Sequence, residues 1–206
     1  RRHKGILKLA QAVAQLPEAL QPLLVVAGAF APEDAALEQQ IRALLPTWRL
    51  QLLGNQPIEG SAHVLALADL VVLLSEGEVA EFQSPAKLSD ALAMGLPVLV
   101  NEAAPLHSLT EQGLALLADP QNLNTQIFKI LSNKESLEAQ GANARIGFNE
   151  TFAIDIVALS LNTATTQIYY SSATGKSHTQ LQRALDILRI GRELIASPAQ
   201  VENEQL

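Results

Sequence analysis

Cysteine is missing from this chain, and several other features that would narrow its function are scarce. Its 206 residues contain no cysteine, which excludes disulfides and thiolate metal sites. No run of about 18 apolar residues occurs and no signal peptide opens the chain, so neither a membrane span nor secretion is expected. The net charge of −7, with only 14 Lys and Arg, argues against nucleic-acid binding, because phosphate neutralisation supplies most of that affinity. A site for a small anion remains compatible with this composition if basic residues gather locally.

What the chain does contain is an alternation of short apolar runs and helical patterns. The apolar content of 48% predicts a substantial core. Strands are expected at 23–26, 48–53, 70–75, 97–100 and 114–117, and helices at 6–16, 32–45, 61–68, 84–95 and 122–131. The run at 23–26 has the pattern of a strand buried on both faces. This order predicts an α/β fold, a doubly wound, Rossmann-like parallel sheet with helices on both faces.

The C-terminal part follows a different pattern. Residues 148–170 contain no Gly or Pro and predict one long helix, whereas 171–177 form a polar linker. An amphipathic helix is expected at 181–195, followed by a disordered tail. We therefore expect a domain at 1–170 and an appendage at 171–206. Because the first residue is Arg1 and not Met, we expect the chain to be a fragment.

The segment 75–100 holds the strongest functional signal. Ser84 suits an N-cap and Pro85 suits the first helical position, so a helix should begin there. The N–H groups of Ala86 and Lys87 are then free to bind an anion, and Lys87 in the first turn is disfavoured unless an anion is present. Because ligands of doubly wound sheets bind beyond the carboxyl ends of the strands, the position fits a binding site. The alternative is that Lys87 only reaches into water and Ser84 only caps the helix.

Other candidate motifs carry little weight. The segment 173–177 ends like a phosphate-binding loop, but the required upstream glycine is Tyr170 and no buried strand precedes it. His63 and His107 are isolated from any matching ligand spacing, so no metal site is expected. No nucleophile signature of the Gly-x-Ser-x-Gly type occurs.

Seven short motifs occur in an order that resembles one family. They are His3-Lys4-Gly5, Val25–Gly28, Leu52–Gly54, Ala66–Ser75, Ser84–Leu88, Ala93–Val98 and Gly113–Pro120. This succession resembles the C-terminal, donor-binding domain of retaining glycosyltransferases of group 1, which are family 4-like and have the two-domain GT-B architecture. The resemblance covers about residues 3–170. No single motif is unique to that family, and the order carries the match.

The resemblance implies roles for particular residues. It assigns Lys4, together with Ser84, Ala86 and Lys87 at the helix start, to the donor diphosphate. Asp90 stands where the family usually has a ribose-binding Glu, and its carboxylate can still accept two hydroxyl hydrogen bonds.

One position departs from the family pattern. The family's second carboxylate, which touches the transferred sugar, falls on Phe82. The neighbouring Glu81 then becomes the candidate catalytic acid.

The resemblance also implies an activity and its requirements. It implies a hexosyltransferase-type enzyme that needs a nucleoside-diphosphate sugar as substrate, and no metal or other cofactor. The helix at 148–170 would cross toward a missing N-terminal acceptor domain, so the isolated chain should be inactive. The protein would be cytoplasmic, or peripheral to the membrane through that missing domain.

Two alternatives remain open. Phe82 in place of the acid is compatible with a degenerate, non-catalytic binding or assembly module. A sugar-nucleotide epimerase of similar architecture is the other alternative, but it should show catalytic His and carboxylate residues that we do not find.

Overall fold

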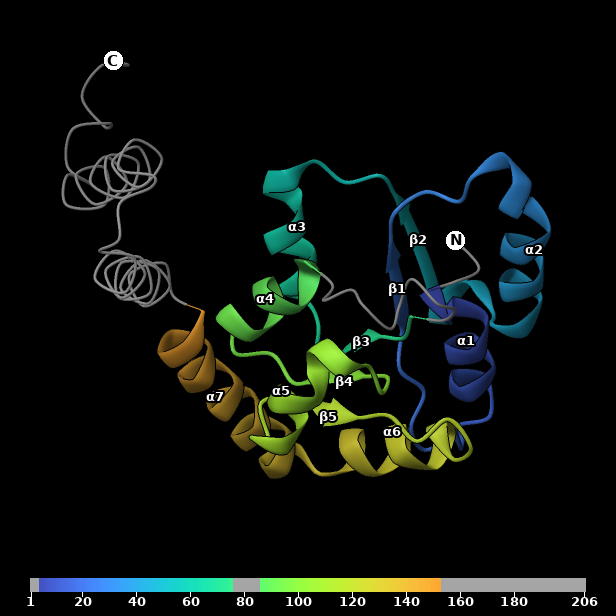
Figure 1. Ribbon diagram of the computed structural model, residues 1–206. Coiled ribbons are helices and arrows are strands. Elements are labelled where there is room, and N and C mark those ends of the chain that lie inside the picture. The colour runs from blue at the N-terminus through green and yellow to red at the C-terminus, as the bar shows by residue number, and fades with distance from the viewer. Residues whose placement is uncertain (1–3, 76–85, 153–206) are drawn as a thin grey trace, which may run out of the picture. The chain divides into compact units, whose positions relative to one another are not determined.

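The computed structural model describes residues 4–75 and 86–152 of the chain (Figure 1). The chain divides into two compact units, 1–148 and 149–206, and the elements that position the candidate site belong to the first. Within the described residues, no helix combines the length and the apolarity that crossing a bilayer requires.

The described strands form two parallel sheets. The first sheet pairs β1 (Leu24–Ala27) with β2 (Leu50–Gly54), with Leu24 opposite Leu50. The second has the order β3-β4-β5 and contains β3 (Val71–Leu73), β4 (Val98–Val100) and β5 (Leu116–Leu117). In it Val71 lies opposite Val98 and Leu99 opposite Leu116. Parallel pairing throughout confirms the predicted α/β class.

Helices connect the strands and cover them (Figure 1). They are α1 (Ile6–Ala14), α2 (Ala35–Leu44), α3 (Ile58–Leu65), α4 (Ala86–Ala93), α5 (His107–Glu111), α6 (Leu123–Ser132) and α7 (Lys134–Thr151). Short 3₁₀ helices occur at η2 (Pro32–Asp34), η3 (Thr47–Arg49) and η5 (Ala104–Leu106). In α1, Leu9, Ala10 and Val13 recur at helical spacing and are buried. An apolar face of this kind stabilises a helix when it packs on the core.

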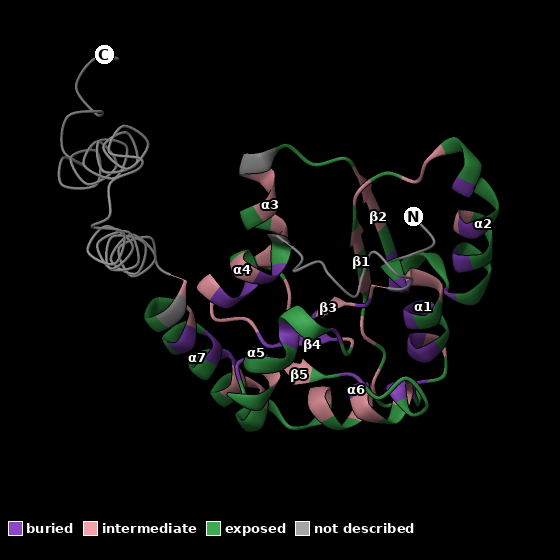
Figure 2. Ribbon diagram, viewed as in Figure 1, coloured by how far each residue is buried: buried purple, intermediate pink, exposed green. Residues whose placement is uncertain are grey.

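One hydrophobic core joins the helices to both sheets (Figure 2). Buried side chains of α1, α2 and α6 pack together with Leu50 at the start of β2 and Leu99 in β4. Helix α1 lies against α2 and against α6. The buried Arg49 closes one end of this core, because its Nη2 donates to the Val13 carbonyl oxygen at 2.9 Å, near the end of α1.

Helix α4 ends at Ala93, close to the end that the sequence predicts at residue 95. Gly95 has φ +71°, and its N–H donates to Leu92 while that of Leu96 donates to Ala91. This pair of bonds is a Schellman motif, which satisfies the last carbonyl groups of the helix. Helix α7 approaches this turn closely, because Gly141 lies against the Gly95 carbonyl group and has no side chain to keep it away.

The strand expected to be buried on both faces is not. In β1 the burial alternates and Val25 is 38% exposed, while Leu23, just before the strand, is 53% exposed. One face of β1 packs on the core through Leu24 and Val26, while the other is open. A continuous apolar run therefore did not identify a two-sided core strand here.

Several element boundaries also differ from the prediction. Trp48 lies in η3 and is 61% exposed, so β2 begins at Leu50 and not at residue 48. Helix α3 begins three residues earlier than predicted, after Pro57 and not at Ser61. Pro57 supplies an extended residue before the first turn, and its carbonyl oxygen accepts the Gly60 N–H at 3.0 Å.

The prediction for the long helix at 148–170 was wrong at its start. Residues 148–151 are helical, but they form the last turn of α7, which begins at Lys134. The remainder of that predicted helix, the linker at 171–177 and the helix at 181–195 lie outside the described residues. The expected domain boundary near residue 170 stays a prediction.

Candidate functional site

The carboxyl ends of β3 and β4 are joined by one polar side chain. Ser75 follows β3, and its N–H donates to the Asn101 Oδ1 at 2.8 Å, where Asn101 is the first residue after β4. The Asn101 Nδ2 donates to the carbonyl oxygen of Glu102 at 3.0 Å. These bonds fix the two strand exits at the edge where doubly wound sheets bind their ligands.

Helix α1 begins at this same edge. Gly5 caps α1 with φ +60°, and a Cβ built on it would lie 2.7 Å from the Leu74 Cβ and 2.8 Å from the Leu74 carbonyl oxygen. Only glycine combines this backbone conformation with so close an approach. The preceding residue, Lys4, is therefore held near the end of β3, and it is exposed.

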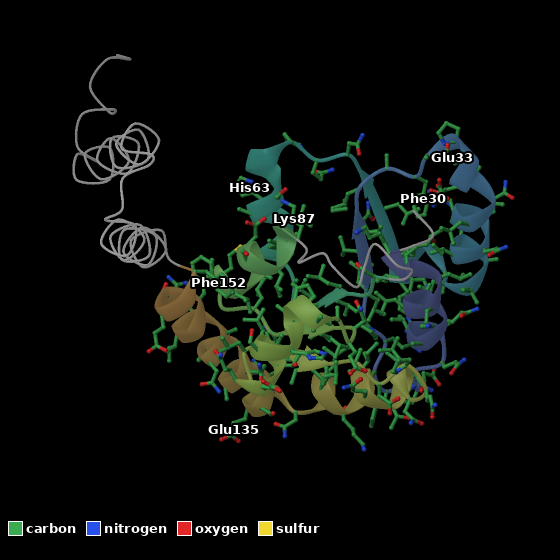
Figure 3. The ribbon with its side chains drawn as sticks, viewed as in Figure 1. Phe30, Glu33, His63, Lys87, Glu135 and Phe152 are labelled. Atoms are coloured by element: carbon green, nitrogen blue, oxygen red, sulfur yellow. The ribbon has the colours of Figure 1, made fainter. Side chains whose placement is uncertain are left out.

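The first turn of α4 carries an organised polar group that contains Lys87 and Asp90. The Lys87 Nζ donates to the Asp90 Oδ2 at 3.0 Å and to the Ser61 Oγ of α3 at 3.3 Å. Figure 3 shows Lys87 projecting from α4 toward α3. An ammonium group has three donors and the described residues accept two of them, so within residues 4–75 and 86–152 one N–H of Lys87 remains for a further acceptor. The side chains of Lys87 and Asp90 are 53% and 48% exposed, so the pair contributes at most about 1 kcal/mol to stability.

A cavity of about 210 Å³ opens at the ends of β3, β4 and β5. Its walls contain both polar and apolar side chains, namely Lys8, Leu74, Ser75, Asn101, Glu102, Ala118, Pro120 and Leu123. Neither Lys87 nor Asp90 is among these residues. The edge thus offers a cavity beside Ser75 and a separate cationic group on α4.

The structure brings together some of the predicted site residues and not others. Lys87 and Asp90 form an ion pair, and Ala86 is the first residue of α4. Glu81, Ser84 and the expected helix start at Pro85 lie outside the described residues. No described hydrogen bond or ion pair joins Lys4 to the Lys87 group.

One residue of the group was missed by the sequence analysis. Ser61 lies 26 residues before Lys87 and on a different helix, so no local spacing indicates that the two side chains meet. Only the packing of α3 beside α4 reveals it.

The histidines do not form a metal centre in the described part of the chain. His107 Nε2 lies 3.8 Å from the Glu102 Oε1, and His63 lies in the last turn of α3. Residues 4–75 and 86–152 contain no group of three or more His, Cys, Asp and Glu side chains placed to hold a metal ion.

The fold and the position of these side chains define a class: a Rossmann-like α/β domain with its candidate binding residues beyond the carboxyl ends of parallel strands. More narrowly, the chain belongs to the glycosyl transferases of group 1, whose family model matches residues 1–146. The resemblance inferred from the sequence motifs is thereby confirmed. A sequence comparison with curated proteins gave no match.

Solved structures of glycosyltransferases share the fold. Sucrose-phosphate synthase from Thermosynechococcus elongatus has 25% identity and a TM-score of 0.63, covering 83% of this chain and 44% of that one. Anabaena HepE, solved in complex with UDP-glucose, has 25% identity and a TM-score of 0.65, covering 81% and 46%. WaaG, a glycosyltransferase involved in lipopolysaccharide biosynthesis, matches in fold with 23% identity, a TM-score of 0.60 and coverage of 80% and 43%. The chain spans less than half the length of these proteins and corresponds to one half of their GT-B fold.

Proposed function

We propose that this chain is the donor-binding domain of a retaining glycosyltransferase and holds a nucleoside-diphosphate sugar for transfer to an acceptor. The observation that carries the proposal is the Lys87 group. A cation in the first turn of a helix, at the carboxyl edge of a parallel sheet, is oriented by Asp90 and Ser61, and the described residues leave one of its three donors without an acceptor. The family membership and the UDP-glucose complex of a matched structure support the choice of ligand.

Each residue would have a distinct task. Lys87 and Lys4 would bind the diphosphate, together with the backbone N–H groups of Ser84, Ala86 and Lys87 at the helix start. The Asp90 Oδ2 accepts from Lys87, and its Oδ1 would accept a ribose hydroxyl at the same time. Glu81 would contact the transferred sugar in place of the acid that the family usually has at the next position.

The chemistry follows from where charge develops. The bond between the anomeric carbon and the diphosphate oxygen breaks, a bond from that carbon to an acceptor hydroxyl oxygen forms with the configuration of the carbon retained, and the hydroxyl proton passes to the leaving diphosphate. The leaving diphosphate gains negative charge, and fixed cations and helix N–H groups stabilise that charge without reorganising. In this proposal the protein groups supply that stabilisation without a metal, and the acceptor binds to another domain of the parent enzyme. The isolated chain would bind the donor and transfer nothing.

Calorimetric titration of the 206-residue chain with UDP and with GDP tests the donor site. We expect one of the two nucleotides to bind at up to millimolar concentration. Lys87→Gln should lower the affinity for that nucleotide at least tenfold, because a charge-assisted hydrogen bond contributes roughly 1.5–3 kcal/mol. Lys134→Gln is the matched control, since Lys134 also pairs with a carboxylate on its own helix but lies on α7. Absence of binding of both nucleotides, or an equal loss in the control, would refute the proposal.

Asp90 is tested with a change in the ligand. We compare the binding of UDP, 2′-deoxy-UDP and 3′-deoxy-UDP. Asp90→Asn should weaken the binding of UDP more than the binding of the deoxy analogue that lacks the hydroxyl contacted by Asp90. Because Lys87 loses its carboxylate partner equally with every ligand, the difference reports only the ribose contact. An identical loss for all three ligands would limit Asp90 to orienting Lys87.

Phe82 favours a second candidate function. The phenyl ring of Phe82 has no carboxylate oxygen to accept a hydrogen bond from a sugar hydroxyl. The loss of that acceptor would fit a GT-B-like module that binds a ligand but transfers no sugar. Assaying the parent protein for donor hydrolysis and transfer separates the two candidates. Glu81→Gln should abolish turnover if Glu81 has taken over the acid's role.

A further inference from the structure

Lys87 is held by partners on two different helices. Its Nζ donates to the Asp90 Oδ2 of α4 at 3.0 Å and to the Ser61 Oγ of α3 at 3.3 Å. Asp90 lies three residues after Lys87 on the same helix, and both side chains are half exposed. A pair of this kind follows from helical spacing alone and holds a long, flexible side chain weakly. The contact with Ser61 therefore adds a point of attachment from outside α4.

Ser61 is suited to be the fixed partner of this contact. A serine side chain is short and moves little when its helix is fixed, whereas lysine carries its ammonium group on a flexible four-carbon stem. Ser61 lies in the first turn of α3, where the Gly60 N–H donates to the Pro57 carbonyl oxygen at 3.0 Å. The position of α3 thus determines where the Lys87 ammonium group lies, and not the reverse.

Helix α3 follows directly from the carboxyl end of β2, and that end is fixed to the end of β1. The Gly28 N–H donates to the Gly54 carbonyl oxygen at 2.7 Å, and the Ala29 N–H donates to the Asn55 Oδ1 at 3.1 Å. Gly28 follows β1, while Gly54 is the last residue of β2. Because these bonds hold the turn that leads into α3, Ser61 connects the β1-β2 edge to the first turn of α4.

The two partners of Lys87 differ in what a bound donor would do to them. In the proposed donor complex, the Asp90 carboxylate is shared between Lys87 and a ribose hydroxyl. Ser61 lies on another helix, and its hydroxyl oxygen has two lone pairs, so its contact with Lys87 does not compete with the ribose. Ser61 can therefore keep Lys87 in place while Asp90 binds the sugar.

We propose that Ser61 is a positioning residue of the donor site. Its hydroxyl oxygen holds the Lys87 ammonium group so that the N–H left without an acceptor by the described residues meets the donor diphosphate. This role rests on the proposed function. It makes the phosphate contact depend on α3, and through α3 on the edge formed by β1 and β2.

NMR relaxation of the lysine Cε methylene groups tests the hold on Lys87 in the ligand-free 206-residue chain. Lys134 is the matched control, because its described partner is Glu138 on its own helix, at 3.8 Å. We expect an order parameter for Lys87 about twice that for Lys134. Ser61→Ala should lower the Lys87 value to the Lys134 value, and Ser61→Thr, which keeps the hydroxyl, should preserve it. Equal values for the two lysines in the parent chain would overturn the proposal.

Titrations followed by NMR test the role of Ser61 in binding. They compare the nucleoside diphosphate that binds, UDP or GDP, with the matching nucleoside. Ser61→Ala should lower the affinity for the diphosphate about fivefold and leave that for the nucleoside within about twofold, because the nucleoside has no phosphate for Lys87 to contact. Ser61→Thr should restore the diphosphate affinity. Ser132→Ala is the control, since Ser132 is an exposed helical serine at the end of α6, and it should change neither affinity.

A double variant separates positioning from direct contact. In the Lys87→Gln background, Ser61→Ala should cause no further loss, because Ser61 acts only through Lys87. A loss that persists in that background would overturn the proposal and make Ser61 a direct ligand contact. An equal loss for the nucleoside and the diphosphate would overturn it too, because Ser61 would then only stabilise α3.

Failure of the proposed function gives a different result. If neither UDP nor GDP binds to any variant, the donor site is refuted and the role of Ser61 in it is refuted as well. The order parameters of Lys87 and Lys134 need no ligand, so they still decide whether Ser61 holds Lys87.

Discussion

Strands β1 and β4 have similar apolar sequences but different environments. Val98, Leu99 and Val100 of β4 are fully buried, because β4 has a strand on either side, α4 lies against it, and Leu99 packs into the core formed by α1, α2 and α6. In β1, Val25 is 38% exposed and only the alternate residues reach the core. The comparison shows that an apolar run specifies a strand, while its neighbours decide how many of its faces are buried. The central strand of the β3-β4-β5 sheet is therefore more deeply buried than β1.

The largest loss of stability is expected at Gly5, where the start of α1 contacts the end of β3. Gly5→Ala places a Cβ against Leu74 in a backbone conformation that alanine disfavours, and we expect a loss of about 2–4 kcal/mol in the free energy of unfolding. Gly113→Ala is the control, since Gly113 has φ +71° but a Cβ added there would meet nothing within 4 Å. That variant should lose only about 1 kcal/mol. Urea unfolding measures both, and equal losses would show that the contact with Leu74 does not matter.

A matched pair of valines tests the comparison between the strands. Val98→Ala removes two methyl groups from a fully buried site and should cost about 2 kcal/mol, from lost burial and the cavity left behind. Val25→Ala removes the same atoms from a partly exposed site and should cost less than about 1 kcal/mol. Urea unfolding at constant pH measures both free energies. A loss for Val25 as large as that for Val98 would mean that the open face of β1 is covered in solution.

The sequence predicted the α/β order well because each strand is short, apolar and separated from the next by a helical pattern. It failed where packing overrides local preference. Helix α7 was missed before residue 148 because Gly141 and Gly147 each weaken a helix by about 1 kcal/mol and the apolar stripe is weak. Contacts of these glycines with Gly95 and Leu114, and the burial of Ala144, stabilise the helix instead.

The candidate site was predictable only where its residues lie close in the sequence. Lys87 and Asp90 are three residues apart in α4, so their pairing follows from helical spacing. Ser61 and Asn101 act across elements, and the sequence gives no local sign of either contact. Long-range polar contacts depend on how helices and strand ends pack, which periodicity does not specify.

The smallest effect is expected on the β5 side, at Asp119. Hydrogen bonds from the Asn122 side chain, first, and from the backbone N–H groups of Gln121 and Asn122 lower the pKa of this exposed carboxyl, which lies at the turn into α6. Because the folded pKa lies below the unfolded one, the stabilisation is fully present above the unfolded pKa, near 4, and is lost as pH falls through the folded value.

Comparing Asp119→Asn with the parent chain by urea unfolding tests this linkage. The variant should be slightly less stable at about pH 7, and the difference should shrink as pH falls below the unfolded pKa and the parent carboxyl becomes protonated. Glu138→Gln removes the same charge from the Lys134 pair on α7 and serves as the control for net charge. A stability difference that persists unchanged at low pH would show that Asp119 acts through packing geometry and not through its charge. In that case the turn into α6 would add nothing electrostatic to the stability of the β3-β4-β5 side.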